Sequence, residues 1–332
     1  EASDQGMDGR FGAGLPRISD GQLLFLQHMI SKMRNDEQGS RIGIVMNGSP
    51  LFTGSAGSGE SEIRRWMLEN DWVEAIIALP TDLFYNTGIQ TYVWLLTNRK
   101  DAARQGKVQL IYADMLNGNS DWANVSKIFE TTDFGYREIR VERPLKLAFT
   151  VTPEGLETLR GAKPFLKLSD DEQTRVLDAL QEHLPQDERW IDRDDFDTAL
   201  TAALRASGVK VAAPVRKVIL SALSKRAEDA NICTDNKSKP EPDTDLRDHE
   251  LVPLNDDWRE YVKREVLPFV PDAWVDESYT DAKDGGIGRV GYEINFNRYF
   301  YKYVPPRQLE EIDAELKALE AEIAGLLREV VE

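Results

Sequence analysis

The sequence predicts an α/β protein. Its first part is the later half of an open α/β sheet with an antiparallel edge hairpin; a mainly helical region and a long heptad helix follow. Three observations lead to this prediction: short apolar runs mixed with helical patterns up to residue 115, helical periodicity from about residue 150, and a 3-4 spacing of aliphatic residues near the C-terminus.

The early elements follow from local patterns. An amphipathic helix is expected from Asp20, which suits the N-cap position, and SEIRRWMLEN should form a second helix after the run FTGSAGSGES at 52–61. The run RIGIVM at 41–46 is typical of a buried parallel strand. Further strands are expected at 72–80, 91–98 and 107–114. The connection TDLFYNTGIQ is too short for a crossover helix, so 72–80 and 91–98 should pair antiparallel.

The patterns suggest five units along the 332 residues. The chain starts at Glu1 and not at a methionine, and its opening residues are loop-like, so we expect a piece of a longer protein. The aromatic and polar alternation at 288–303 predicts a hairpin or an extended segment. The expected units are an α/β part (1–148), a helical region (149–226), a polar linker (227–250), a mixed segment (251–304) and a docking helix (305–332).

The last helix carries the clearest repeat. Pro305 and Pro306 mark its expected start, and the a/d positions of a heptad are Leu309, Ile312, Leu316, Leu319, Ile323, Leu326 and Val330. Spacing alone leaves two interpretations open: a helix packed on its own domain, or a coiled-coil helix that docks on a partner. Residues 305–332 hold eight acids and three bases, so a basic or mixed-charge partner would suit them.

Composition excludes several classes of function. The net charge is −17, from 41 Lys and Arg against 58 Asp and Glu, which argues against this chain as the main grip on a nucleic acid. Cys233 is the single cysteine, and the three histidines are far apart, so neither disulfides nor a metal site is expected. No apolar run has the length of a membrane span and no signal peptide opens the chain, which predicts a cytoplasmic protein.

The glycine run at 52–61 raises the question of a nucleotide site. Gly54, Gly59 and Ser61 fit the P-loop spacing, but Glu60 stands where the phosphate-binding lysine belongs. No third glycine completes a dinucleotide motif. Glu60 and Glu62 instead fall in the first turn of the following helix, where carboxylates interact favourably with the positive end of the helix dipole. We expect a mobile loop whose glycines provide backbone freedom.

Several stretches resemble the modification subunit of type I restriction-modification systems, an adenine-N6 DNA methyltransferase. The most specific are ALPTDLFYNTGI and GYEINFNRYFYKY; DGQLLFLQHMI, GSRIGIVMNGSPLFTG, FGYREIRVERPLKLAF and the final helix also match. The resemblance covers most of the chain outside the helical middle and the linker. It implies S-adenosylmethionine as cofactor, DNA as substrate, and a specificity subunit and a restriction subunit as partners.

The resemblance also implies site residues. Phe25 matches the position of an aromatic against the cofactor's adenine; Phe84, with Tyr85 as its alternative, matches the position that stacks on the flipped target base. The alternative for Phe25 and Phe84 is a core aromatic. The family's cofactor glycine motif and its Asn-Pro-Pro-Phe/Tyr motif are missing here, so no catalytic residue is assigned and we expect this chain to be inactive alone.

Two other functions compete with this one. The chain could be an assembly module that supplies half a sheet and a docking helix without contacts to cofactor or substrate. It could also be a nucleotide-binding protein that uses the glycine run, which predicts that Glu60→Lys would improve ATP or GTP binding.

Overall fold

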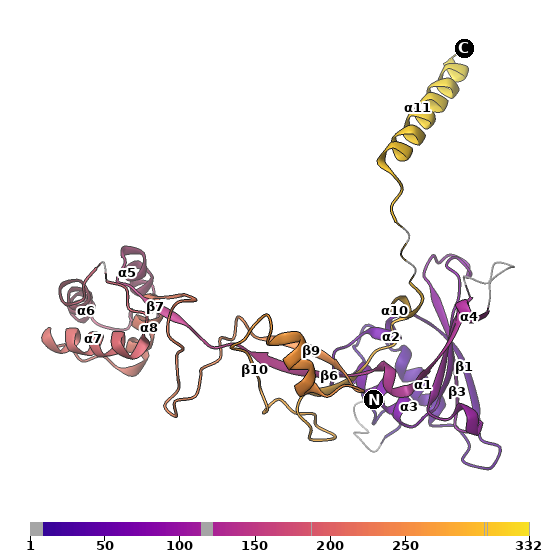
Figure 1. The fold of residues 1–332 in the computed structure, drawn as a ribbon, viewed down its shortest axis with the longest axis horizontal. Helices are drawn as coiled ribbons and strands as arrows, with labels where there is room; N and C mark the ends of the chain where they lie inside the picture. Colours follow the sequence, from indigo (N-terminus) through magenta and orange to yellow (C-terminus); the bar gives the residue numbers. More distant parts are fainter. Residues whose placement is uncertain (1–8, 114–121, 187, 302, 304, 332) are drawn as a thin grey trace.

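The computed structural model describes residues 9–113, 122–186, 188–301, 303 and 305–331. An α/β unit lies at one end and a helical region at the other, with a small second sheet between them; the last helix projects away from the α/β unit (Figure 1). Of the helices in these ranges, none has the length and apolar character needed to cross a membrane.

The α/β unit is built on a five-stranded mixed sheet with the order β1-β3-β2-β4-β5. Its strands are β1 (Arg41–Asn47), β2 (Val73–Ala78), β3 (Thr91–Thr97), β4 (Lys107–Tyr112) and β5 (Ser126–Glu130). The predicted antiparallel pairing of β2 with β3 is confirmed. Its predicted edge position is wrong, because β1 continues the sheet beyond β3 and β4 pairs in parallel with β2 on the other side.

Strand β1 differs from its prediction as a buried parallel strand. Its neighbour in the described part of the chain is β3, which is antiparallel to it, and exposed residues alternate with buried ones along the strand. Ile42 and Met46 face the core, whereas Val45 is 49% exposed. The strand therefore has apolar side chains on both faces of the sheet, and only one of these faces is buried here.

Helices α1 (Gln22–Ile30) and α3 (Gly59–Glu69) cover one face of this sheet, and the short α2 (Ser49–Phe52) precedes α3. The core between them includes Leu26, Ile63 and the fully buried Trp94. The N-cap of α3 is Ser58, whose side chain accepts from the Ser61 N–H. Asp20 is not the N-cap of α1; Gly21 holds that position, and Asp20 accepts from the backbone N–H of Gln22.

The opposite face of the sheet is also apolar. The strand register aligns Val45, Val93, Ile77 and Ile111 in one row, next to Leu95. These side chains are partly or largely exposed, and they lie outside the buried clusters that the described residues form. Sheets of α/β proteins normally carry cover on both faces, so this face is suited to a further layer.

A second sheet is centred on β6 (Gly135–Glu142). Strand β9 (Asp248–Pro253) pairs with it along one edge, and β10 (Trp274–Val275) and β11 (Arg289–Tyr292) pair with it in succession along the other. The predicted extended segment at 288–303 is confirmed only in part, because β11 is followed by the helix α10 (Phe296–Phe300). The short elements of the two sheet regions are η2 (Ala102–Arg104), α4 (Trp122–Val125), η4 (Thr131–Phe134), α9 (Trp258–Tyr261) and η5 (Val262–Val266).

The helical region leaves and rejoins the second sheet through the strand pair β7 (Leu147–Phe149) and β8 (Ser224–Arg226). Its four predicted helices are confirmed, and they enclose a core of their own around Phe165, Phe196 and Leu200. They are α5 (Pro153–Arg160), α6 (Asp170–His183), α7 (Arg193–Ala206) and α8 (Ala213–Ala222).

Residues 227–250, expected as a polar linker, form an arm with fixed contacts. Antiparallel bridges join Ile232 to Lys146 and Pro242 to Pro144. Cys233 is buried, and Asp243 is buried beside the Arg226 guanidinium. Composition alone did not reveal this order, because the arm is held by backbone pairing and an ion pair and not by apolar side chains.

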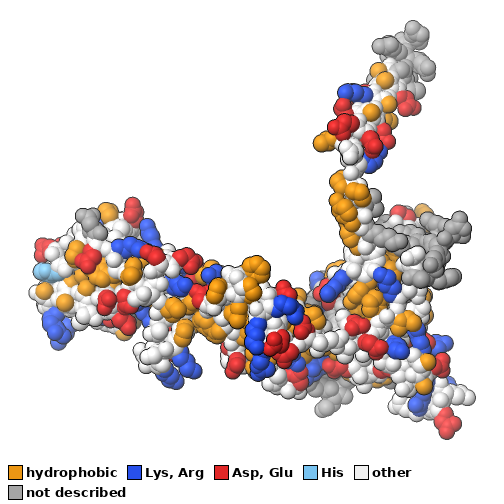
Figure 2. Space-filling model, in the orientation of Figure 1, with side chains coloured by type: hydrophobic (Ala, Val, Ile, Leu, Met, Phe, Trp, Pro, Cys, Tyr) orange, Lys and Arg blue, Asp and Glu red, His pale blue; other side chains and the backbone are white. Residues whose placement is uncertain are grey.

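Helix α11 (Leu309–Val331) starts three residues after Pro306. Leu309, Leu316, Leu319 and Ile323 are more than half exposed, and Ile312 is partly exposed. The side chains of Leu326 and Val330 lie outside the described residues. Figure 2 shows hydrophobic side chains along the connection to α11 and acidic ones mixed with apolar ones on the helix.

An ion pair joins the α/β unit to the loop between β10 and β11 of the second sheet. Arg65 in α3 donates from Nη1 to both carboxylate oxygens of Asp281 at 3.0 Å, and both side chains are buried. Burial alone would raise the pKa of Asp281, but the N–H groups of Val290 and Asp284 and the Arg65 guanidinium outweigh it and lower the pKa to about 2.

Removal of this pair should destabilise the protein in a pH-dependent way. Asp281→Ala should lower the free energy of unfolding by about 3 kcal/mol at neutral pH, because a buried arginine loses its main partner. The pKa is about 2 in the folded chain against 3.8 as the ordinary value, so the contribution is complete above about pH 4 and disappears as the pH falls towards 2. Urea unfolding at several pH values measures this.

The matched control is Asp284→Ala in the same loop. Its carboxylate binds Arg137 and is more exposed than that of Asp281. This variant should cost below about 1 kcal/mol. Equal losses for both variants would contradict the role given to Asp281.

Candidate functional site

The candidate site is one edge of the five-stranded sheet. Strands β1 and β2 are both antiparallel to β3, and β4 is parallel to β2, so the carboxyl ends of β1, β2 and β4 lie at the same edge. Open α/β sheets bind ligands at this edge. The loops there that the structure describes are 48–58 after β1 and 79–90 after β2.

A polar cluster joins the start of α1 to the end of β1. The Asn47 N–H donates to Gln22 Oε1 at 2.9 Å, and the Ser49 hydroxyl donates to Asn47 Oδ1 and to the Asp20 carboxylate. Burial would raise the pKa of Asp20, but the hydrogen bonds from Ser49 and Gln22 lower it, so the carboxylate is charged at neutral pH. The cluster fixes the first turn of α1 at the sheet edge.

Phe25 lies in that first turn, and its side chain is 69% exposed. A core aromatic would be buried, as its neighbours Leu23 and Leu26 are. An exposed ring beside the carboxyl end of β1 can stack on a planar ligand. Its role against a cofactor stays a prediction.

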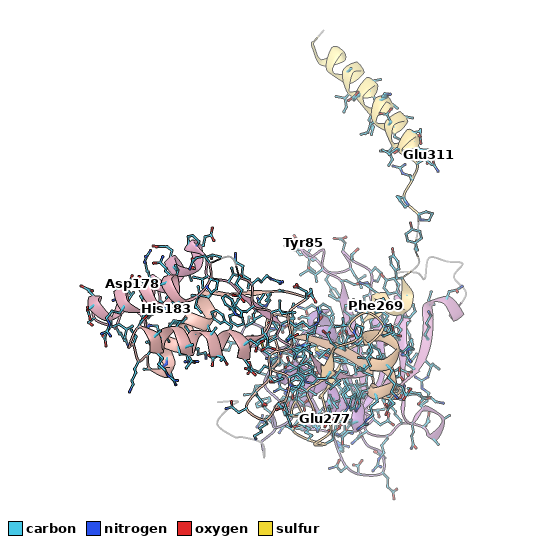
Figure 3. All side chains as sticks on the ribbon, turned by 60° about the vertical axis from the view of Figure 1, so that its left-hand side comes forward. Tyr85, Asp178, His183, Phe269, Glu277 and Glu311 are labelled. Carbon is cyan, nitrogen blue, oxygen red and sulfur yellow. The ribbon has the colours of Figure 1, made fainter. Side chains whose placement is uncertain are left out.

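The loop 79–90 presents a second group of exposed apolar side chains. Tyr85 is 95% exposed and Phe84 42% exposed, with Leu83 and Ile89 also at the surface. Figure 3 shows Tyr85 at the upper rim of the body, on the side from which α11 leaves. Asp82 and Asn86 adopt positive φ angles on either side of the two aromatics. Neither ring is used by the core, and their role at a target base remains a prediction.

The glycine loop 52–59 is held by a buried arginine. Arg64 Nη1 donates to the carbonyl oxygens of Thr53 at 2.8 Å and Pro50 at 3.1 Å, and Nη2 to Gly54 at 3.3 Å. Its Nε donates to the Tyr292 carbonyl at 2.5 Å. Burial lowers the pKa of Arg64 to about 10, so it stays protonated at neutral pH. These bonds hold the start of the loop, and the mobility expected for the loop stays a prediction.

Two residues of the P-loop pattern, Glu60 and Ser61, have hydrogen-bond partners within the chain. Glu60 accepts from the Arg17 backbone N–H at 3.0 Å, and the buried Ser61 hydroxyl accepts from the Tyr292 N–H at 3.1 Å. Gly54 has a φ of 91°, and a Cβ there would lie 2.3 Å from the Ser58 hydroxyl oxygen. Gly54 thus serves a tight turn. The described residues contain no group of three or more His, Cys, Asp or Glu placed to hold a metal ion.

Sequence reasoning missed Arg64 and Arg65. One signal was available: Arg64 sits between Ile63 and Met67 on the apolar face of α3, and a charge at such a position needs fixed partners. Its partners are backbone carbonyls, which every residue has, so the pattern of side chains in the sequence does not predict them. The partner of Arg65, Asp281, is far away in the sequence.

Part of the chain is similar to known DNA methylases. Residues 2–135 match the family model of N-6 DNA Methylase. Curated relatives that the chain matches are methylase subunits of type I restriction enzymes. The chain is 39% identical over 75 residues to the type I restriction enzyme MjaVII methylase subunit of Methanocaldococcus jannaschii, which covers 23% of this chain and 12% of the relative.

Two further proteins are similar to part of the chain. The type I restriction enzyme HindI methylase subunit of Haemophilus influenzae is 33% identical over 114 residues, which is 34% of this chain and 24% of the relative. A solved type I restriction-modification methyltransferase subunit from Streptococcus thermophilus is 30% identical, over 36% of this chain and 25% of that one, with a TM-score of 0.30. The matches thus span at most a quarter of these relatives.

Loss of the arginine clamp should loosen the glycine loop. Arg64→Leu leaves several buried carbonyls without donors and should lower the free energy of unfolding by about 2–4 kcal/mol, with faster proteolysis within residues 52–58. Arg41→Leu, which removes an exposed arginine of β1, is the control and should cost below about 1 kcal/mol. An unchanged loop in Arg64→Leu would show that the clamp is dispensable.

Proposed function

We propose that this chain is the C-terminal part of a type I restriction-modification methyltransferase subunit, which transfers a methyl group from S-adenosylmethionine to adenine N6 in DNA. The observation that carries the proposal is the match of residues 2–135 to N-6 DNA Methylase on a sheet whose ligand edge exposes aromatic rings. The domain division given by the sequence is part of the proposal, with 1–148 as the methyltransferase portion.

The exposed aromatics suit this chemistry. A base extruded from the duplex loses stacking, and Phe84 or Tyr85 on an exposed loop would restore it. Phe25 would pack on the adenine of the cofactor from the start of α1. The residues that orient the amino group for attack are not among those present here, since the sequence has no Asn-Pro-Pro-Phe or Asn-Pro-Pro-Tyr motif. This chain alone is therefore proposed to be inactive.

The geometry of β1 supports the view of a partial sheet. Its edge away from β3 has no neighbour within the described ranges, and the open face of the sheet carries Val45, Val93 and Ile77. Exposed apolar strand edges and faces are aggregation hazards that complete domains cover. Further strands beyond β1 and a helical layer on the open face would complete the methyltransferase fold.

The partners follow from charge and from α11. An acidic chain needs another subunit to hold and read DNA. We assign that task to a specificity subunit, to which α11 offers an exposed aliphatic stripe, and cleavage to a restriction subunit. The complex acts in the cytoplasm.

The alternative is a non-catalytic assembly module that docks on a DNA-specificity subunit. The exposed stripe of α11 favours it as much as it favours the enzyme. The two functions differ in whether the longer subunit binds S-adenosylmethionine with the help of this part.

The proposed role of the loop aromatics can be tested by methyl transfer. In the longer subunit with its specificity partner, Phe84→Ala should lower kcat for tritium transfer from labelled S-adenosylmethionine to DNA by about tenfold or more, because stacking of an extruded base is worth about 1–3 kcal/mol. Leu83→Ala changes the exposed neighbour and serves as the control. Equal activity of Phe84→Ala, Tyr85→Ala and wild type would contradict base stacking by this loop.

The docking role of α11 can be tested by co-purification. Leu316→Asp with Leu319→Asp places two charges in the aliphatic stripe and should abolish capture of the specificity subunit, since burial of unpaired charge is unfavourable. Circular dichroism and the unfolding midpoint should be unchanged, because the stripe is exposed. Glu320→Lys on the same helix is the control; retained capture by the double variant would defeat the assignment.

A further inference from the structure

The base of the loop 79–90 contains a hydrogen-bonded group that the proposed function does not use. Gln90 is the last residue of the loop, next to β3. Its Oε1 accepts from the Tyr92 hydroxyl at 2.9 Å, and its Nε2 donates to the Tyr112 hydroxyl at 3.3 Å. One side chain thus joins the loop to the start of β3 and to the end of β4.

The two tyrosine rings rest on α10. Tyr92 lies 5.2 Å from Phe296 between ring centroids, and Tyr112 stacks on Phe300 at 5.7 Å. Phe296 and Phe300 themselves stack at 5.8 Å, and both are buried. Burial raises the pKa of Tyr92, so its hydroxyl keeps its proton and can donate to Gln90 at neutral pH. The four rings form a continuous support below Gln90.

This support is fixed to the rest of the unit. Residues just before α10 donate from the backbone, Ile294 to the Leu51 carbonyl and Glu293 to the Phe134 carbonyl, both at 2.9 Å. By contrast, the hydrogen bonds inside the loop are local and long, such as Thr87 N–H to the Phe84 carbonyl at 3.4 Å. The position of the loop therefore depends on its ends, where Leu79 N–H also donates to the Thr91 carbonyl at 2.8 Å.

We propose that Gln90, held by Tyr92 and Tyr112 on the platform of α10, is a positioning residue that sets the place of Phe84 and Tyr85 at the target base. The inference rests on the proposed function. An aromatic ring that is already held in position binds an extruded base without the entropic cost of ordering its loop. A loop released at Gln90 would still meet DNA but would hold the extruded base less often.

The experiment compares three variants in the longer subunit with its specificity partner and a duplex that carries 2-aminopurine at the target position. Gln90→Leu removes both hydrogen bonds. Gln90→Glu keeps two, because both tyrosine hydroxyls can donate to a carboxylate. Tyr112→Phe removes one while it preserves the ring stack on Phe300. Tyr261→Phe, which deletes a hydroxyl bound to Glu250 in the second sheet, is the control.

Gln90→Leu should lower the 2-aminopurine signal of the extruded base and kcat by about tenfold, with the Kd for DNA unchanged within about twofold. Gln90→Glu should restore most of the 2-aminopurine signal and of kcat. For Tyr112→Phe, both quantities should lie between those of Gln90→Leu and wild type. Full activity of Gln90→Leu would overturn the proposal. So would an equal loss in Gln90→Glu, because that result would indicate a packing effect and not a positioning one.

A second readout separates this inference from the proposed function. In the chain as described here, Gln90→Leu should speed hydrogen exchange of the amides at 81–89 by about tenfold while exchange in α6 stays the same. If the wild-type complex transfers no methyl group, the proposed function fails. Faster exchange at 81–89 would still support Gln90 as the anchor of the loop, and unchanged exchange would overturn it.

Discussion

Two adjacent arginines on α3 set the constraint on which the rest of the α/β unit depends. Arg64 donates to the carbonyls of Thr53 and Gly54 and to that of Tyr292, and Arg65 binds the buried carboxylate of Asp281. One turn of helix thus fixes the loop after β1 and the chain that returns from the second sheet. This attachment and the backbone hydrogen bonds of Glu293 and Ile294 together place α10 below the loop 79–90.

This attachment explains how the chain accommodates a separate helical region. Strands β6 and β11 are paired, and the chain between them leaves to build α5–α8 before it returns through the arm 227–250. The helical region has its own core, so its folding does not require the α/β sheet. The returning segment, in contrast, contributes Val290, Ile294 and Phe296 to the core of the α/β unit. Sequence-distant residues therefore complete the candidate site.

The sequence predicted what local periodicity encodes. The four helices of the middle region, the strand at 41–46 and the β2–β3 pairing follow from apolar spacing and loop length. The pairing of β4 with β2 could not be predicted. After the turn at 98–106, local sequence does not determine which strand of the sheet β4 pairs with. Phe25, Phe84 and Tyr85 came from family resemblance; all three are exposed, and their roles stay predictions. Arg64, Asp281 and Gln90 act through partners distant in sequence or through backbone atoms, which leave no local pattern.

The central claim is that this chain forms the later half of a methyltransferase sheet that continues beyond β1. Hydrogen exchange of the β1 amides in this chain and in the longer subunit tests it most directly. The account predicts that alternate amides between Ile42 and Met46, those that point away from β3, exchange rapidly in this chain and become protected in the longer subunit, while the amides bonded to β3 are slow in both. Rapid exchange of the same amides in the longer subunit would contradict it.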